Sequence, residues 1–223
     1  MLRALLAVLL LHLGDLRTAD QLIDDLWGEP APRSARASLH NLMSSLRRTI
    51  GHELLRSGRS GYVLEIREDQ LDACRFEQLL VSSRSAHLGE KVRLLEAALG
   101  LWRGSPLLDV RYEAFAQAEI RRLEELHVCA REDLLTAKLA LGGCEAVVPE
   151  LQRLVDGFPF RERLRMQLMM ALHRSGRSVE ALVTYGDWRC LLMESWGMEP
   201  GQEIRQLCDD IVHAPALAGA GLR

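Results

Sequence analysis

Between residues 33 and 50, apolar side chains recur at the three- and four-residue spacing of a helix. They are Ala35, Leu39, Leu42, Met43, Leu46 and Ile50. This spacing predicts a helix over 33–50 that buries one narrow stripe. Pro32 is placed to begin this helix, because a proline in the first turn gives up only an N–H that has no helical partner, and Gly51 is placed to end it.

A second pattern follows this helix directly. Two short runs with β-branched and aromatic residues, within 53–66, flank a turn rich in serine and glycine. Short runs of this kind on either side of a Ser/Gly turn predict a β-hairpin.

The first residues of the chain are apolar, with eight consecutive apolar side chains over 4–11. We expect a buried helix that ends at Gly14. A secretion signal is the alternative, but no small-x-small cleavage site follows, and the run is too short to span a bilayer.

A second helix is predicted from a capping signal. Thr18 and Gln21 have the spacing of a capping box, Leu22, Ile23 and Leu26 form the buried side, and Gly28 follows at the end. Three helices with short connections and then a hairpin are the order of a winged helix-turn-helix.

Helical patterns continue over the remainder of the chain. The predicted helices are 72–86, 90–102, 114–141, 144–158, 161–174, 178–196 and 202–212. Gly142 and Gly176 each follow an apolar helix end and lie about one tetratricopeptide period, roughly 34 residues, apart. The fold class is therefore predicted as mainly α, a winged helix-turn-helix followed by a tetratricopeptide-like helical repeat domain. The predicted boundaries are 1–68 and 72–213, with a flexible tail at 214–223.

Charge is distributed unevenly. The chain has a net charge of −3, yet residues 31–67 hold seven arginines and two glutamates, so the remainder is acidic. The five cysteines form no C-x-x-C pair, which favours free thiols in a reducing cytosol and hence a cytoplasmic protein.

The face of helix 33–50 opposite the apolar stripe carries small polar side chains and arginine, with no acid between Pro30 and His52. A basic helix of this kind suits the major groove of duplex DNA. Serine and asparagine can contact base edges, and arginine holds phosphates. Ser38, Asn41 and Ser45 are the candidate base contacts. The candidate phosphate contacts are Arg33, Arg36, Ser44, Arg47 and Arg48, with Arg56 and Arg59 on the hairpin.

Four stretches together resemble the Streptomyces antibiotic regulatory protein family. They are the apolar run 4–11, Leu-Ile-Asp-Asp-Leu-Trp-Gly at 22–28, Ser-Leu-Arg-Arg at 45–48 and Gly-Tyr-Val-Leu at 61–64. The resemblance covers residues 2–212 and implies an OmpR-type winged helix followed by a bacterial transcriptional activator domain. Members of the family carry a small antiparallel sheet before their first helix, and the sequence printed here begins at that helix.

The resemblance also implies partners. It implies an activator of a secondary-metabolite (antibiotic) biosynthesis gene cluster that binds tandem direct repeats near a promoter −35 element and recruits RNA polymerase. It places DNA contacts at positions matching Ser38, Asn41, Ser44, Ser45 and Arg47. A module this small is expected to need a homodimer on paired half-sites for useful affinity. No membrane partner is expected.

Motifs of enzymes are missing from the sequence. No phosphate-binding loop, dinucleotide fingerprint, nucleophile elbow or H-E-x-x-H occurs, and the seven histidines are scattered. Glu124 and His127 have the spacing of half a di-iron motif, for which a surface Glu–His pair is the simpler interpretation. We therefore predict a protein that is not an enzyme, with no cofactor and no metal site.

A second function stays open on sequence grounds. The acidic remainder of the chain is typical of a helical scaffold that binds a protein partner or a small-molecule signal without binding DNA. The arginine-rich stretch 32–66 separates the two hypotheses, because a scaffold has no need of it.

Overall fold

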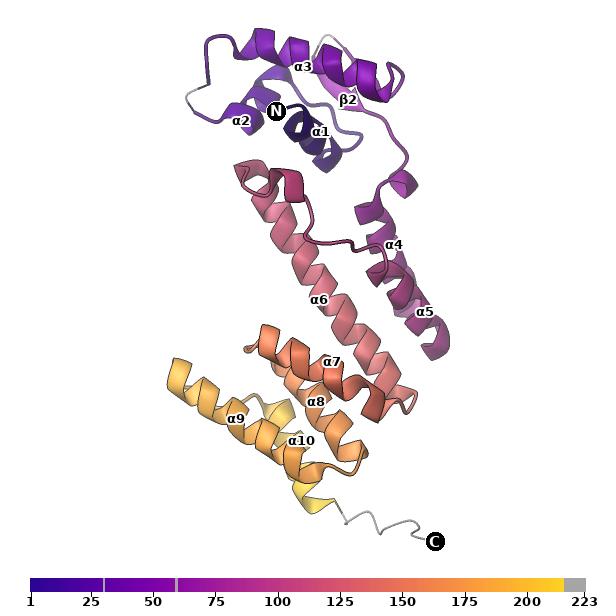
Figure 1. Ribbon diagram of the computed structural model, residues 1–223, viewed down its shortest axis with the longest axis vertical. Coiled ribbons are helices and arrows are strands. Elements are labelled where there is room, and N and C mark those ends of the chain that lie inside the picture. The colour runs from indigo at the N-terminus through magenta and orange to yellow at the C-terminus, as the bar shows by residue number, and fades with distance from the viewer. Residues whose placement is uncertain (30, 59, 215–223) are drawn as a thin grey trace. The chain divides into compact units, whose positions relative to one another are not determined.

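The computed structural model describes residues 1–29, 31–58 and 60–214, and Figure 1 labels its elements. The chain forms two compact units, each of which is described by itself. The first comprises Met1–Ser82 and Ala97–Cys129, and the second comprises Ser83–Glu96 and Ala130–Arg223. The predicted tail lies outside the described residues after Ala214, and so does Arg59.

Three helices and a hairpin begin the first unit. They are α1 (Leu2–Leu11), α2 (Ala19–Trp27), α3 (Ala35–Ile50), β1 (Leu55–Ser57) and β2 (Tyr62–Leu64). The core takes Leu5 and Leu9 from α1, Leu22 from α2, and Leu39 and Met43 from α3. The apolar run at the N-terminus is thus a buried helix, and the predicted order of three helices and a hairpin is confirmed.

The capping box at the start of α2 is also confirmed. Thr18 Oγ1 accepts a hydrogen bond from the backbone N–H of Gln21, and the Gln21 side chain accepts one from the N–H of Thr18. Both bonds satisfy N–H groups that have no partner inside the helix.

The beginning of α3 differs from the prediction. The helix begins at Ala35, and a turn precedes it in which the N–H of Ala35 donates to the carbonyl of Pro32 at 2.9 Å. Arg33 and Ser34 lie in this turn, and Pro32 does not occupy the first helical position. The proline initiates the turn, and the helix follows from the turn.

The hairpin is held by a third segment of backbone. In its antiparallel register Leu55 pairs with Leu64 and Ser57 with Tyr62. On its other side Tyr62 exchanges two backbone hydrogen bonds of 2.9 Å with Arg17. Gly61 approaches this segment so closely that a Cβ there would lie 2.3 Å from the Arg17 carbonyl oxygen. The wing is therefore seated on the connection between α1 and α2.

Later segments complete the first unit. Two short helices, η2 (Leu108–Val110) and η3 (Ala114–Ala116), contact α1, and Val110 and Ala116 join its core. The other elements that contribute to this unit are η1 (Glu68–Gln70), α4 (Asp72–Ser85), α5 (Leu88–Leu99) and α6 (Gln117–Ala140). Of these, α4, α5 and α6 each continue into the second unit.

The second unit is a stack of antiparallel helices. Its further members are α7 (Cys144–Gly157), α8 (Glu162–Arg174), α9 (Ser178–Trp196) and α10 (Gln202–His213). Helix α8 packs against both α7 and α9, and Leu151, Leu164 and Ala181 are fully buried between them. The predicted helical repeat is present, with ends within a few residues of those expected.

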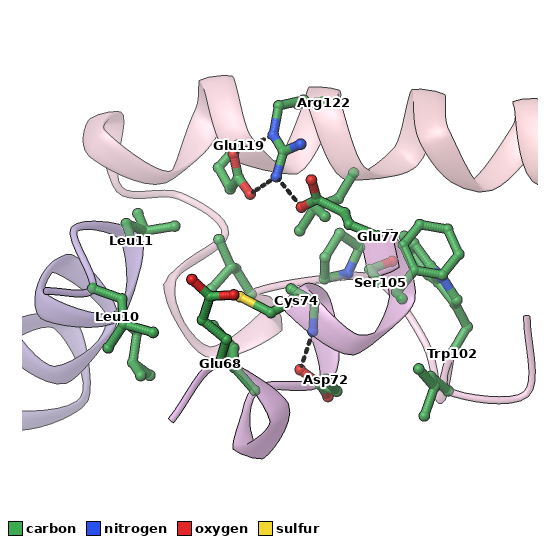
Figure 2. Close-up of a pocket in the computed structure, with 18 of the residues that line it drawn as sticks. Leu10, Leu11, Glu68, Asp72, Cys74, Glu77, Trp102, Ser105, Glu119 and Arg122 are labelled. Atoms are coloured by element: carbon green, nitrogen blue, oxygen red, sulfur yellow. Dashed lines mark hydrogen bonds and ion pairs between the residues drawn. The ribbon is translucent and has the colours of Figure 1, made fainter. Parts of the chain in front are cut away.

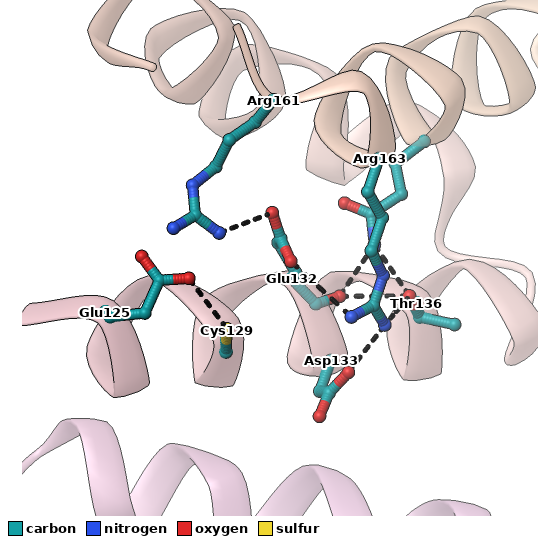
Figure 3. A network of polar contacts seen from close by, with 8 residues as sticks. Glu125, Cys129, Glu132, Asp133, Thr136, Arg161 and Arg163 are labelled. Carbon is teal, nitrogen blue, oxygen red and sulfur yellow. Dashed lines mark hydrogen bonds and ion pairs between the residues drawn. The ribbon is translucent and has the colours of Figure 1, made fainter. Parts of the chain in front are cut away.

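A buried carboxylate connects α6 to α8 in this unit. The Glu132 side chain is 4% exposed and lies 3.3 Å from Arg161 Nη1 and 3.5 Å from Arg163 Nη1 (Figure 3). Gln167 donates to the backbone carbonyl of Glu132 at 2.7 Å. The two arginines compensate a carboxylate charge that would otherwise be costly to bury.

Of the helices in the described part of the chain, none combines the length and the hydropathy needed to cross a membrane.

Candidate DNA-binding surface

One side of α3 is exposed to solvent. Asn41, Ser44 and Arg48 are exposed and lie three and four residues apart, so they share one face of the helix. The buried residues Leu39, Met43 and Leu46 occupy the opposite side and fix the helix in the core. The structure therefore brings together three of the predicted contact residues on one accessible ridge.

His40 is also exposed on α3 and is not among the contact residues predicted from the sequence. It precedes Ser44 by four residues, so the two side chains are neighbours on the helix surface. That spacing is the sequence signal from which His40 could have been found.

Ser38 and Ser45 are less accessible than predicted. Both are half-buried, and the Ser45 hydroxyl accepts a hydrogen bond of 3.1 Å from Arg48 Nη2. Ser45 was expected on the outer face, but the structure places it at the margin of that face. The bond holds the Arg48 side chain along the ridge.

Arg47 links the helix to the wing. Its Nε donates to the backbone carbonyl of Leu55 at 3.2 Å, and its guanidinium carbon lies 6.0 Å from the centre of the Tyr62 ring. The side chain is half-buried and contacts both strands of the hairpin. Arg47 therefore ties α3 to both strands of the hairpin, independently of any ligand contact.

Two other predicted arginines are paired with acids at the surface. Arg36 Nη2 lies 2.5 Å from Asp20 Oδ1, and Arg56 Nε lies 3.0 Å from Glu65 Oε2, with both arginine side chains more than 70% exposed. Exposed pairs of this kind contribute little to stability, about 0–1 kcal/mol. A phosphate can replace the carboxylate at small cost, so both arginines remain available.

Positively charged side chains lie near both ends of α3. No acid lies in the first turn of α3, and Arg47 and Arg48 lie in its last turn, where cations stabilise the helix dipole. Arg33 is exposed just before the helix. The surface therefore presents positive charge at both ends of α3, with Asn41 and Ser44 between them.

Comparison with known proteins shows the family. The sequence profile of the bacterial transcriptional activator domain matches residues 71–212. The chain is also 32% identical to the regulatory protein DnrI of Streptomyces peucetius, over 95% of this chain and 84% of DnrI. The chain belongs to the Streptomyces antibiotic regulatory protein family of transcriptional regulators.

Other members of the family are longer. The regulatory protein AfsR of Streptomyces griseus is 38% identical over 95% of this chain, which spans only 22% of AfsR. The structure of Mycobacterium tuberculosis EmbR in complex with a low-affinity phosphopeptide matches 95% of this chain and 58% of that one, with a TM-score of 0.88 and 32% identity. The mainly helical fold predicted from the sequence is confirmed by this similarity.

Proposed function

We propose that this chain activates transcription, in the manner of its family, by inserting α3 into the major groove of a duplex and laying the hairpin on the adjacent backbone. The observation that carries the proposal is the acid-free ridge of Asn41, Ser44 and Arg48 on α3. The names of its relatives support the same activity, since AfsR, DnrI and RedD are named as regulators.

Each exposed side chain on the ridge has a distinct role in this proposal. Asn41 hydrogen-bonds a base edge, for which adenine is the best match, and Ser44 lies beside it near the sugar–phosphate backbone. Arg48 binds a phosphate, with Arg33 and Arg36 doing so at the other end of the helix. Ser38 and Ser45 contact bases only at the margin of the groove, because both are half-buried.

The hairpin has a secondary role. Arg56, released from Glu65, reaches the neighbouring phosphates, and the same role is proposed for Arg59, which lies outside the described residues. Arg47 contributes by holding the wing in place and by the part of its guanidinium that stays accessible.

The wider arrangement is also proposed. Residues 1–68 bind DNA, and residues 72–213 act as the activator domain that recruits RNA polymerase. Two copies bind tandem direct repeats near a promoter in the cytoplasm, because one small module gives limited affinity.

The test begins by selecting binding sites from a random duplex pool with the purified chain. Affinity for the selected DNA is then measured by fluorescence anisotropy at several salt concentrations. Arg48→Ala is expected to reduce the salt slope by about one and to weaken binding to all sequences alike. Asn41→Ala is expected to cost about 1–3 kcal/mol and to relax the preference at one base position.

Arg174→Ala is the matched control, since Arg174 is an exposed arginine at the end of α8 in the second unit. It is expected to leave both the slope and the affinity unchanged. If the folded chain binds no duplex at low salt, or if Arg174→Ala weakens binding as much as Arg48→Ala, the proposal is wrong.

A further inference from the structure

The first unit contains a cavity of about 560 Å³ that lies away from the ridge on α3. Its walls come from the end of α1, the beginning of α4, the segment 101–108 and the beginning of α6, all of which belong to this unit. Figure 2 shows Leu10 and Leu11 on one side and Trp102 on the other, with Glu68 and Cys74 between them. The volume lies in the range that holds drug-sized molecules.

The aromatic wall is held rigidly. The Trp102 ring packs edge-on against Phe76, with the ring centres 5.5 Å apart, and stacks on the ring of His127 at 4.1 Å. Phe76 is itself buried. A flat apolar surface is therefore in place before any ligand arrives, which lowers the cost of binding.

The polar lining is predominantly acidic. Five carboxylates and two arginines line the cavity. Arg122 is held between Glu77 at 2.6 Å and Glu119 at 2.7 Å, and Arg103 lies 3.3 Å from Asp72. Both arginines are thereby engaged with acids of the wall.

Asp15 and Glu68, which are both exposed, differ from these paired acids. Within the described part of the chain neither carboxylate is paired with a cation, and the Glu68 side chain accepts one long hydrogen bond, of 3.4 Å, from the Gln78 amide. The neighbouring thiol adds no positive or negative charge, because burial raises the pKa of Cys74 and the carboxylates of Glu68 and Glu77 raise it further. Glu68 therefore presents a solvent-exposed carboxylate at the cavity, without a counter-ion from the described chain.

Backbone strain marks the same wall. Leu107 lines the cavity and has a φ of 51°, the single positive φ outside glycine in the described part of the chain. A branched side chain in this conformation costs free energy, and such residues are concentrated at binding sites.

The carboxylates are spread around the wall. Within the described ranges, no three His, Cys, Asp or Glu side chains are grouped so that they could hold a metal ion. An inorganic cation is thus a poor match, and an anion would meet Glu68. The class of ligand that remains combines an apolar body with a positive charge.

We propose that this cavity binds an amphiphilic organic cation, with its apolar or aromatic part against Leu10, Leu11 and Trp102 and its protonated amine at Glu68. The inference concerns this cavity alone and does not depend on DNA binding by α3.

A pair of fluorescent probes tests the charge requirement. Dansylcadaverine and dansyl-aminohexanoate share the same naphthalene body and a similar tail, but the first ends in an ammonium group and the second in a carboxylate. Both are titrated into the full chain, and binding is followed by the increase in dansyl emission. The cation is expected to bind at least ten-fold more tightly than the anion.

Three variants locate the site. Glu68→Gln keeps an acceptor for Gln78 and is expected to weaken the cation about ten-fold, the equivalent of one charge-assisted hydrogen bond. Ala73→Phe fills the cavity and is expected to abolish binding. Asp24→Asn removes an exposed acid of α2 outside the cavity and is expected to change nothing.

A measurement on the unaltered chain covers the case in which a variant does not fold. Saturating dansylcadaverine is expected to slow alkylation of Cys74 by N-ethylmaleimide several-fold, with the exposed Cys190 on α9 as the internal control. Equal binding of the two probes, binding of neither, or equal protection of Cys74 and Cys190 would overturn the proposal.

Discussion

The Nε of Arg47 on α3 donates a hydrogen bond of 3.2 Å to the backbone carbonyl of Leu55 on β1. This bond spans the two parts of the proposed DNA-binding surface, and the buried Leu55 and Leu46 side chains pack beside it in the same core. Arg47, a predicted phosphate contact, is thus also a structural link between the helix and the hairpin. Its substitution changes the wing and the helix together.

Replacing Arg47 with alanine is expected to destabilise the first unit by about 1–2 kcal/mol, because a half-buried charge-assisted hydrogen bond is lost. Urea unfolding monitored by circular dichroism measures this change. Arg48→Ala provides the comparison, since Arg48 is exposed and its described bond is to Ser45 on the same helix. Equal stability of the two variants would show that the hydrogen bond from Arg47 to Leu55 does not stabilise the first unit.

Gly61 allows the wing to approach the α1–α2 connection. A Cβ at this position would meet the Arg17 carbonyl oxygen at 2.3 Å, so Gly61→Ala is expected to displace the hairpin and cost about 2–3 kcal/mol. The same change at Gly58 meets no atom within 4 Å and is expected to be neutral or slightly stabilising. Thermal unfolding of both variants tests this expectation. An unfolding temperature unchanged by Gly61→Ala would contradict the close contact between the hairpin and the connection between α1 and α2.

Glu132 is expected to be the most sensitive acid of the second unit. In Glu132→Ala the guanidinium groups of Arg161 and Arg163 lose a buried acceptor, at a cost of about 2–4 kcal/mol (Figure 3). Asp133→Ala removes an acid that is 40% exposed beside the same Arg163 and is expected to cost less than about 1 kcal/mol. The denaturant midpoints of the two variants should differ clearly. Similar midpoints would mean that the buried carboxylate of Glu132 contributes no more to stability than the partly exposed carboxylate of Asp133.

The pair of Arg189 and Glu199 gives a prediction on pH. The Arg189 guanidinium donates to both carboxylate oxygens, at 2.8 and 2.9 Å, and lowers the pKa of Glu199 from its ordinary value of 4.5. Since the folded pKa is the lower one, the stabilisation is present above the ordinary value and is lost as the pH falls through the depressed value. Carbon-13 NMR titration should place the Glu199 pKa below 4.5, and Arg189→Ala should raise that pKa.

Local features of this fold are readable from the sequence, because they depend on neighbours three or four residues apart. The apolar periodicity of α3, the capping box of Thr18 and Gln21, and the Ser/Gly turn of the hairpin all belong to this class. Together with the arginine-rich composition of 31–67, they suffice to predict the winged helix and the residues of its ridge.

Contacts between distant segments were decided by the tertiary structure alone. The hairpin partly buries Arg47, and Gly61 approaches the backbone carbonyl of Arg17 in the connection between α1 and α2. The cavity beside Trp102 likewise draws its walls from four separate stretches of the chain. A periodic sequence pattern does not predict such contacts. They result from the packing of whole elements, whereas helix and turn preferences act within a few residues.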